Sequence, residues 1–168
     1  YGGFGPQPFF EQLLERITSL PGVQSVGAVS GVGLWGACTA EGQTTPVEVS
    51  SLACSVGAHD YLRTMGIALL QGRYLTKEDI IGGDNNVIIN EAAARQFWPG
   101  ENPIGKRISR GLDLVTVVGV VKTTRTWSYA YEGGPLLYNP YNMDPMRVRP
   151  LHADFVVRST GDPLNLVR

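Results

Sequence analysis

The two ends of this chain contain the same kinds of element in opposite order, and this constrains the fold more than any other feature. At the start, residues 9–20 carry apolar side chains at helical spacing, and a Pro-Gly pair then ends the helix. Residues 23–30 follow as a strand of valines and small residues. At the other end, a strand over 154–159 leads to Asp162, which is followed by proline and is typical of a helix start. The ends therefore predict the two halves of a split βαβ unit.

A split unit of this kind requires an insertion between its halves. The sequence predicts an α+β fold in which residues 1–55 and 151–168 form the βαβ part. Residues 56–150 are predicted to form an inserted, mixed α/β lobe. A helix that has barely begun at Arg168, and the lack of a first strand, predict that the parent chain continues in both directions.

Between the ends, short segments alternate between strand-like and helix-like patterns. The strongest strand pattern, at 115–122, is β-branched and apolar enough to predict a central strand. Residues 136–138 lie between prolines and are predicted to form an edge strand. Residues 31–45 are rich in glycine, threonine and alanine and are predicted to be a loop. The other predicted elements are strands at 47–54, 67–70 and 86–90 and helical segments at 60–65, 76–79 and 91–98.

The charge and composition exclude several classes of function. The chain has 14 lysines and arginines against 15 acidic residues, so it lacks the cationic excess typical of nucleic-acid-binding domains. Hydrophobic residues make up 43% and charged residues 17% of the chain, which predicts a folded core rather than a disordered segment. No apolar run approaches the roughly 18 residues of a membrane helix, and no signal-peptide pattern opens the sequence.

Two glycine-rich strings have the spacing of nucleotide-binding motifs but lack the required flanking elements. Residues 31–36 spell GxGxxG after a strand, yet no helix is predicted to begin there and receive a pyrophosphate. Residues 100–107 have phosphate-loop spacing, but Arg107 occupies the position that requires serine or threonine. This second string also follows a helix and leads into a strand. We interpret both strings as structural.

The titratable side chains form no recognisable catalytic or metal-binding pattern. Imidazole and carboxylate lie close in sequence only at His59 with Asp60 and at His152 with Asp154, and no serine lies in a nucleophile elbow. Two isolated histidines make no convincing zinc site. We therefore interpret His59 as the start of a helix and His152 as a residue on a strand surface.

Two groups of side chains keep alternative interpretations. Cys38 and Cys54 pair in an oxidising compartment, or are two small core or loop residues in a reducing one. Trp127, Tyr129 and Tyr131 cluster in a loop, where they form either a contact surface or a group that folds back on the body.

Several segments, in a fixed order, resemble a known family. The most specific is residues 89–108, INEAAARQFWPGENPIGKRI. The others are 10–16, 20–27, 60–67, 70–73, 117–121 and 138–141. Together, over residues 9–168, the chain resembles the periplasmic core domain of MacB-like ABC transporter permeases, of the duplicated orphan permease type abundant in acidobacteria.

This resemblance implies an extracytoplasmic domain between two membrane helices, with a porter-like βαβ part and a Sabre-like inserted lobe. It implies that the domain itself is not an enzyme and holds no cofactor or metal. ATP is expected to be hydrolysed by a separate cytoplasmic ABC ATPase, and this domain is expected to couple the resulting motion to a substrate or partner protein. The implied partners are a second copy or sister half of the permease, the ATPase and a periplasmic adaptor protein. In this oxidising location Cys38 and Cys54 are expected to form a disulfide.

Two other functions remain open from the sequence. One is a free-standing interaction or adaptor domain of similar fold, which the flanking sequence would distinguish. The other is a small nucleotide-binding enzyme, based on the two glycine strings, which a measurement of nucleotide affinity would distinguish.

Overall fold

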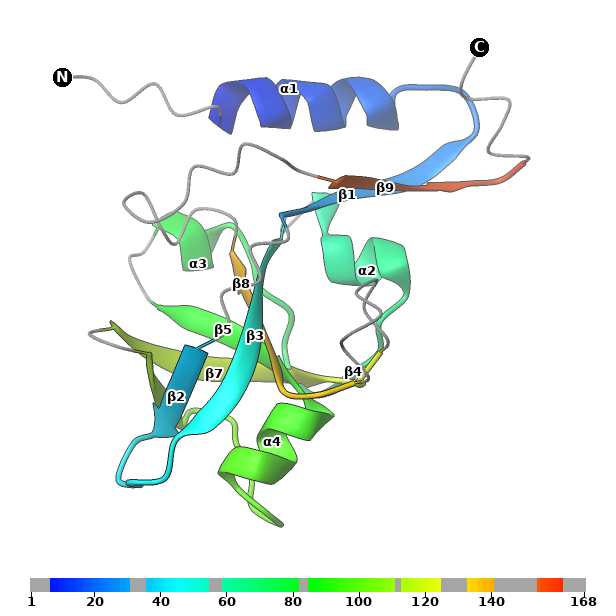
Figure 1. Cartoon of the computed structure of the whole chain (residues 1–168). Coiled ribbons are helices and arrows are strands. Elements are labelled where there is room, and N and C mark those ends of the chain that lie inside the picture. Colours follow the sequence, from blue (N-terminus) through cyan, green and yellow to red (C-terminus); the bar gives the residue numbers. More distant parts are fainter. Residues whose placement is uncertain are drawn as a thin grey trace, which may run out of the picture.

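The computed structural model describes residues 7–30, 36–54, 59–81, 85–110, 113–124, 133–140 and 154–161. Within these ranges nine strands form one sheet, and four helices lie around it (Figure 1). The helices are α1 (Gln7–Thr18), α2 (Tyr61–Met65), α3 (Glu78–Ile81) and α4 (Glu91–Phe97). The strands are β1 (Val23–Ser30), β2 (Gly36–Ala40), β3 (Val47–Cys54), β4 (Leu69–Gly72), β5 (Asn86–Asn90), β6 (Arg107–Arg110), β7 (Asp113–Val121), β8 (Leu136–Pro140) and β9 (Asp154–Ser159). This mixture confirms the predicted α+β class.

Six of the strands close into a small barrel. The pairing runs β2–β6–β7–β5–β8–β3, and β3 also pairs with β2, which completes the ring. Successive side chains of a strand point to opposite faces, so alternate residues fill the interior. In β5, Val87 and Ile89 belong to the inner core cluster, whereas Ile88 belongs to a second cluster on the outer face. The barrel interior is therefore a packed core.

Helix α4 covers one end of this barrel (Figure 1). The Asn90 side chain accepts a hydrogen bond from the Ala93 N–H and begins the helix, and a Pro-Gly pair follows its last turn. Phe97 and Trp98 are buried and join the inner core cluster. The prediction that these two aromatic side chains fill the core is confirmed.

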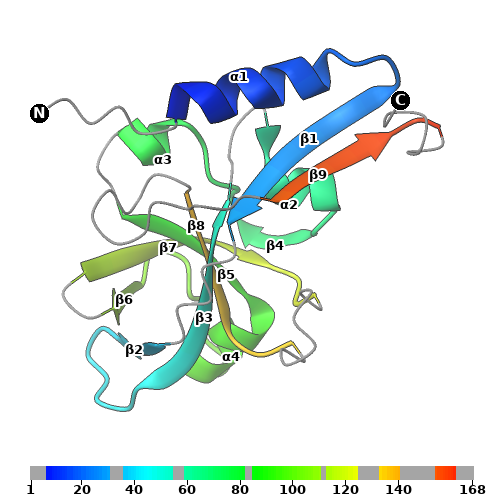
Figure 2. The ribbon, with the colours of Figure 1, turned by 45° about the horizontal axis from the view of Figure 1, so that its top comes forward.

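Helix α1 and strands β1 and β9 form a second layer at the opposite end of the molecule, which we call the terminal layer (Figure 2). Strands β1 and β9 pair antiparallel along most of their length. Helix α1 packs on one face of β1, where Leu14 clusters with Val26 and Ala28. Helix α2 packs against both strands. The first and last described strands thus lie side by side, as a split unit predicts.

The predicted loop at 31–45 is wrong, because it contains strand β2. This strand has no apolar periodicity, but it pairs with β3 on one side and with β6 on the other. The predicted strand at 67–70 is β4, which begins two residues later. The Ile67 N–H instead donates to the Leu62 carbonyl at the end of α2. In both places tertiary or neighbouring contacts outweigh the local pattern.

A strand is present at 136–138 as predicted, but the prediction that it lies at an edge of the sheet is wrong. It is β8, which lies between β5 and β3 and is buried along its whole length. Pro135 precedes the strand and Pro140 ends it, so neither proline removes a donor from the middle of the ladder. The remaining predicted strands and helices in the described ranges begin within two residues of the observed ones, and the predicted helix start at Asp162 lies outside those ranges.

The sheet also bears on the division of the chain. Strands β2 and β3 close the barrel, so pairing places residues 36–54 with the lobe rather than with the terminal layer. The division into a part formed by 1–55 plus 151–168 and an inserted lobe formed by 56–150 stays a prediction. In the part of the chain that the structure describes, no helix has the length and apolar character needed to span a membrane.

Candidate functional site

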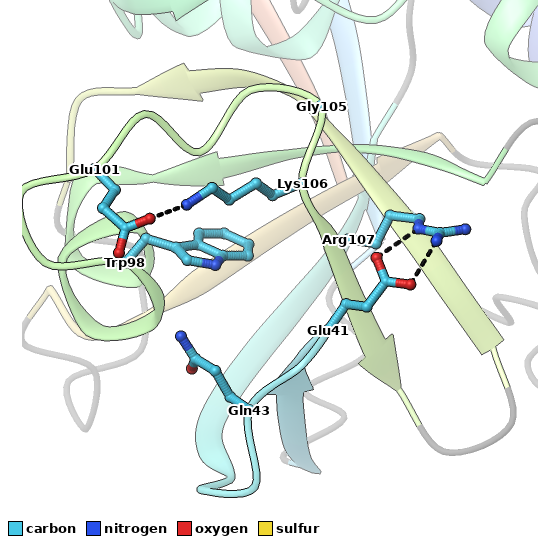
Figure 3. Close-up of a pocket in the computed structure, with 7 residues that line it drawn as sticks. All are labelled: Glu41, Gln43, Trp98, Glu101, Gly105, Lys106 and Arg107. Atoms are coloured by element: carbon cyan, nitrogen blue, oxygen red, sulfur yellow. Dashed lines mark hydrogen bonds and ion pairs between the residues drawn. The ribbon is translucent and has the colours of Figure 1, made fainter.

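A hollow of about 410 Å³ lies at the end of the barrel that faces away from the terminal layer (Figures 1 and 3). It lies between the turn after β2 and the loop that joins α4 to β6. Its lining side chains are mostly charged or polar: Glu41, Gln43, Trp98, Glu101, Gly105, Lys106 and Arg107.

The pairing of β2 with β6 brings one charged pair of this hollow together. Ala40 lies opposite Ile108, so Glu41 and Arg107 continue the ladder at its end, and the Glu41 N–H donates to the Arg107 carbonyl at 2.9 Å. The Arg107 Nε donates to Glu41 Oε2 at 2.7 Å, and its Nη2 donates to Oε1. This two-pronged pair is the geometry in which a guanidinium binds a carboxylate most specifically.

The loop between α4 and β6 supplies the second charged pair. The Lys106 ammonium donates to the Glu101 carboxylate and lies 5.5 Å from the ring centre of Trp98 (Figure 3). On the opposite wall, Gln43 Nε2 donates to the Phe97 carbonyl at 2.8 Å. Each of these side chains is therefore held in place before any partner arrives.

The chemistry of this hollow favours contact rather than catalysis. The charges of two carboxylates and two cations cancel in two ion pairs, and these four side chains remain between 34% and 61% exposed. Trp98 is only 5% exposed, so its ring offers little surface for stacking with a ligand. A second, smaller hollow of about 190 Å³ lies on the other side of Trp98, between α4 and β4.

The phosphate-loop string at 100–107 uses its backbone donors within the protein. The Gly105 N–H donates to the Val117 carbonyl at 2.8 Å, and the Lys106 N–H donates to the Pro103 carbonyl at 3.1 Å. A phosphate cradle requires such amides to point at the ligand. The string at 31–36 lies outside the described residues except for Gly36, which begins a strand rather than a helix. The structural interpretation of 100–107 is supported.

The titratable side chains that burial perturbs lie at α2, far from the hollow. Burial raises the pKa of Asp60 above its ordinary value, against the opposing effect of Arg63. Burial also raises the pKa of the Tyr61 hydroxyl and of the Cys54 thiol. His59 lies one residue before Asp60, which caps α2, and its Nδ1 is 3.3 Å from Thr18 Oγ1. The described ranges hold no group of three or more side chains suited to a metal ion.

The two cysteines do not form the predicted disulfide. Neither is disulfide-bonded and both are buried, Cys38 in the inner core cluster and Cys54 in the outer one. Cys38 lies opposite Val47, at the other end of β3 from Cys54. A strand that rises about 3.3 Å per residue separates the two positions by roughly 20 Å, and a disulfide requires Cα atoms within about 7 Å. The alternative of two small core residues fits the structure.

Other predicted site residues lie outside the described ranges. These are His152 and the aromatic group of Trp127, Tyr129 and Tyr131. Conversely, no sequence pattern indicated the Glu41–Arg107 pair, because the two residues are 66 positions apart and only the pairing of β2 with β6 joins them.

Residues 2–159 match the family of MacB-like periplasmic core domains. The chain belongs to this family. The resemblance seen in the sequence is therefore confirmed, and the chain is an extracytoplasmic domain of a MacB-like ABC transporter permease, as predicted.

Curated relatives extend well beyond this domain. The chain is 34% identical over 119 residues to the macrolide export ATP-binding/permease protein MacB of Agrobacterium fabrum, a match that covers 69% of this chain and 18% of that protein. It is 31% identical over 90 residues to the uncharacterized ABC transporter permease YvrN of Bacillus subtilis, with 52% and 22% covered. The MacB-like domain thus spans about a fifth of these relatives.

Solved structures share the fold of this MacB-like domain. The periplasmic region of MacB from Actinobacillus actinomycetemcomitans superposes with a TM-score of 0.67 at 20% identity, covering 99% of this chain and 75% of that one. The extracellular domain of the noncanonic ABC-type transporter YknZ from Gram-positive bacteria gives a TM-score of 0.64 at 21% identity, with 90% and 73% covered.

Proposed function

We propose that this chain is a non-catalytic coupling domain of its permease, which transfers ATP-driven movement in the membrane to a substrate or partner protein outside it. The observation that carries this proposal is the family match over residues 2–159. The fold supports it, because the terminal layer and the polar hollow lie at opposite ends of one continuous sheet (Figure 1). A displacement of one end therefore has a packed route to the other.

The proposed partners follow from the family. They are a second copy or sister half of the permease, a cytoplasmic ABC ATPase at which ATP is bound, and a periplasmic adaptor protein. The MacB relative is named as an ATP-binding/permease protein, which supports the link to ATP outside this domain. We propose that no cofactor binds in the domain itself. The polar hollow is the proposed contact surface for a protein partner, together with Trp127, Tyr129 and Tyr131.

The alternative functions have less support. A nucleotide-binding enzyme needs free amide donors at 100–107, and those of Gly105 and Lys106 are used by the protein's own carbonyls. A free-standing interaction domain has the same fold and differs only in its flanking sequence. Calorimetry of the domain with ATP, GTP and NAD tests the first, and heat of binding would favour the enzyme.

The decisive experiment follows amide protection in the working transporter. The full-length permease is assembled with its ATPase in lipid nanodiscs, and hydrogen–deuterium exchange is measured with and without ATP and vanadate. A coupling domain is expected to change its amide protection when nucleotide is trapped at the ATPase. Identical protection throughout the domain in both states would contradict the proposed function.

A further inference from the structure

We propose that α2, together with His59 and Asp60 before it, transmits displacement of the terminal layer into the barrel. This inference rests on the proposed coupling function and names the part of the fold that performs it. In both views α2 lies beside β1 and β9, between the terminal layer and the strands of the barrel (Figures 1 and 2).

Segment 59–66 contacts every element of the terminal layer. At its start, His59 Nδ1 lies 3.3 Å from Thr18 Oγ1, at the end of α1. In its first turn, the backbone of Tyr61 lies against β1. In its last turn, the Thr64 carbonyl accepts a hydrogen bond from Arg158 Nε of β9 at 3.2 Å. A cation at the C-terminal end of a helix also suits the helix dipole.

The contact with β1 is a direct contact between two backbones. A Cβ atom at Gly27 would lie 2.6 Å from the Tyr61 Cα and 2.9 Å from its nitrogen, closer than real atoms approach. Glycine is therefore required for this packing. Because no side chain lies between the two backbones at this point, a movement of β1 displaces α2 directly.

On its other side, α2 shares a hydrophobic core cluster with the barrel. Tyr61 and Leu62 belong to the outer core cluster with Ile88 of β5 and Tyr138 of β8. The helix itself is capped at both ends, because Asp60 caps its start and Gly66 adopts a left-handed conformation at its end. Close-packed groups of this kind shift together rather than deform.

The strand pairing that joins the terminal layer to the barrel, between β1 and β3, is short. Strands β1 and β3 share two residue pairs, Val29 with Cys54 and Ser30 with Ala53, at the ends of both strands. A short ladder at two strand ends permits rotation about it. Helix α2 packs beside that ladder, because Tyr61 and Leu62 belong to the same core cluster as Val29 and Cys54. It therefore supports the angle between the terminal layer and the barrel.

The test adds variants to the exchange experiment on the full-length permease and its ATPase in nanodiscs. Arg158→Ala removes the bond to α2 from a side chain at an exposed position, and Gly27→Ala separates the two backbones. The matched controls are Arg16→Ala, at an exposed position of α1, and Gly36→Ala, where an added Cβ meets nothing within 4 Å.

In wild type and both controls, trapped nucleotide is expected to change protection in β1 and β9 and in barrel strands β5 and β7. In Arg158→Ala and Gly27→Ala, the change in β1 and β9 is expected to remain, while that in β5 and β7 falls about fivefold or more, a loss typical of broken coupling between sites. A Gly27→Ala protein that lacks protection before nucleotide is added has not folded, and Arg158→Ala then decides alone.

The outcomes separate the two proposals. A barrel response in Arg158→Ala equal to wild type, in a wild type that does respond, overturns the role of α2 and leaves the coupling function in place. A wild type that shows no response in any element of the domain overturns the coupling function and the role of α2 with it.

Discussion

Asn90 joins three elements through one side chain. Its Oδ1 accepts from the Ala93 N–H at 2.9 Å and from the Leu136 N–H at 3.0 Å, and its Nδ2 donates to the Gly134 carbonyl at 2.8 Å. The residue is 1% exposed, so none of these groups has water as a substitute. The start of α4 and the start of β8 thus depend on this amide.

We expect Asn90→Ala to lower the free energy of unfolding by about 3 kcal/mol, because a helix cap is lost and buried backbone groups lose their partner. Urea denaturation followed by circular dichroism measures the change. Asn85→Ala is the control, since its amide makes one exposed hydrogen bond at 3.3 Å. A loss no larger than in the control would contradict this role.

Gly119 lies where β7 pairs with the end of β4, and this position requires glycine. A Cβ atom there would lie 2.3 Å from the Arg73 carbonyl oxygen, which belongs to the backbone and has little freedom to move. We expect Gly119→Ala to destabilise the fold by about 2 kcal/mol through overpacking. Melting temperatures measure this loss of stability. Gly161→Ala is the control, because its added Cβ meets nothing within 4 Å. Equal melting temperatures in the two variants would show that β4 moves freely.

At the scale of an element, the segment from β4 to α3 is organised by one carboxylate. Both terminal nitrogens of Arg73 donate to Asp79, at 2.7 and 2.8 Å. The Thr76 N–H and the Asn86 amide donate to the same group, each at 2.7 Å. The predicted pair of Thr76 and Asp79 is therefore hydrogen-bonded, as part of a larger network, although α3 begins at Glu78. Hydrogen bonding to Arg73 is the main cause that lowers the pKa of Asp79.

The lowered pKa of Asp79 predicts a loss of stability in acid. A carboxyl whose pKa is lower in the folded state stabilises the fold above its ordinary pKa of 3.8, and this contribution is lost as the pH falls below that value. Melting temperatures of wild type and Asp79→Asn between pH 7 and pH 2 measure it. We expect the difference between the two proteins to shrink as the pH falls. A constant difference would contradict it.

The carboxyl of Asp60 changes the stability of the fold with pH in the direction opposite to that of Asp79. Burial raises its pKa, so its contribution is present below the ordinary carboxyl pKa and is lost as the pH rises through the folded value. Comparing wild type with Asp79→Asn isolates the contribution of Asp79, because Asp60 is the same in both proteins.

At the scale of the whole molecule, barrel closure predicts the state of the thiols. Cys38 and Cys54 are each 1% exposed and lie at opposite ends of β3. We expect both to remain reduced after expression in an oxidising periplasm and to react with iodoacetamide only once the protein is unfolded. Intact mass spectrometry measures both properties. A native mass lower by two hydrogens, with no reaction after unfolding, would show a disulfide and contradict this packing.

The sequence determined the elements whose signals are local. Helical spacing, a cap or a Pro-Gly stop lies within a few residues, which is why α1, α4 and the strands β1, β5 and β7 were predicted nearly in place. The resemblance at 89–108 also gave the family without any structure.

The tertiary structure alone decided the closed barrel, the central place of β8 and the polar hollow. Strand β2 has no pattern of its own and exists because β3 and β6 pair with both its edges. Arg107 meets Glu41 across 66 positions. Propensity and capping act between neighbours in the chain, whereas pairing and burial act between segments that only folding brings together, so the first can be predicted from one sequence and the second requires the fold.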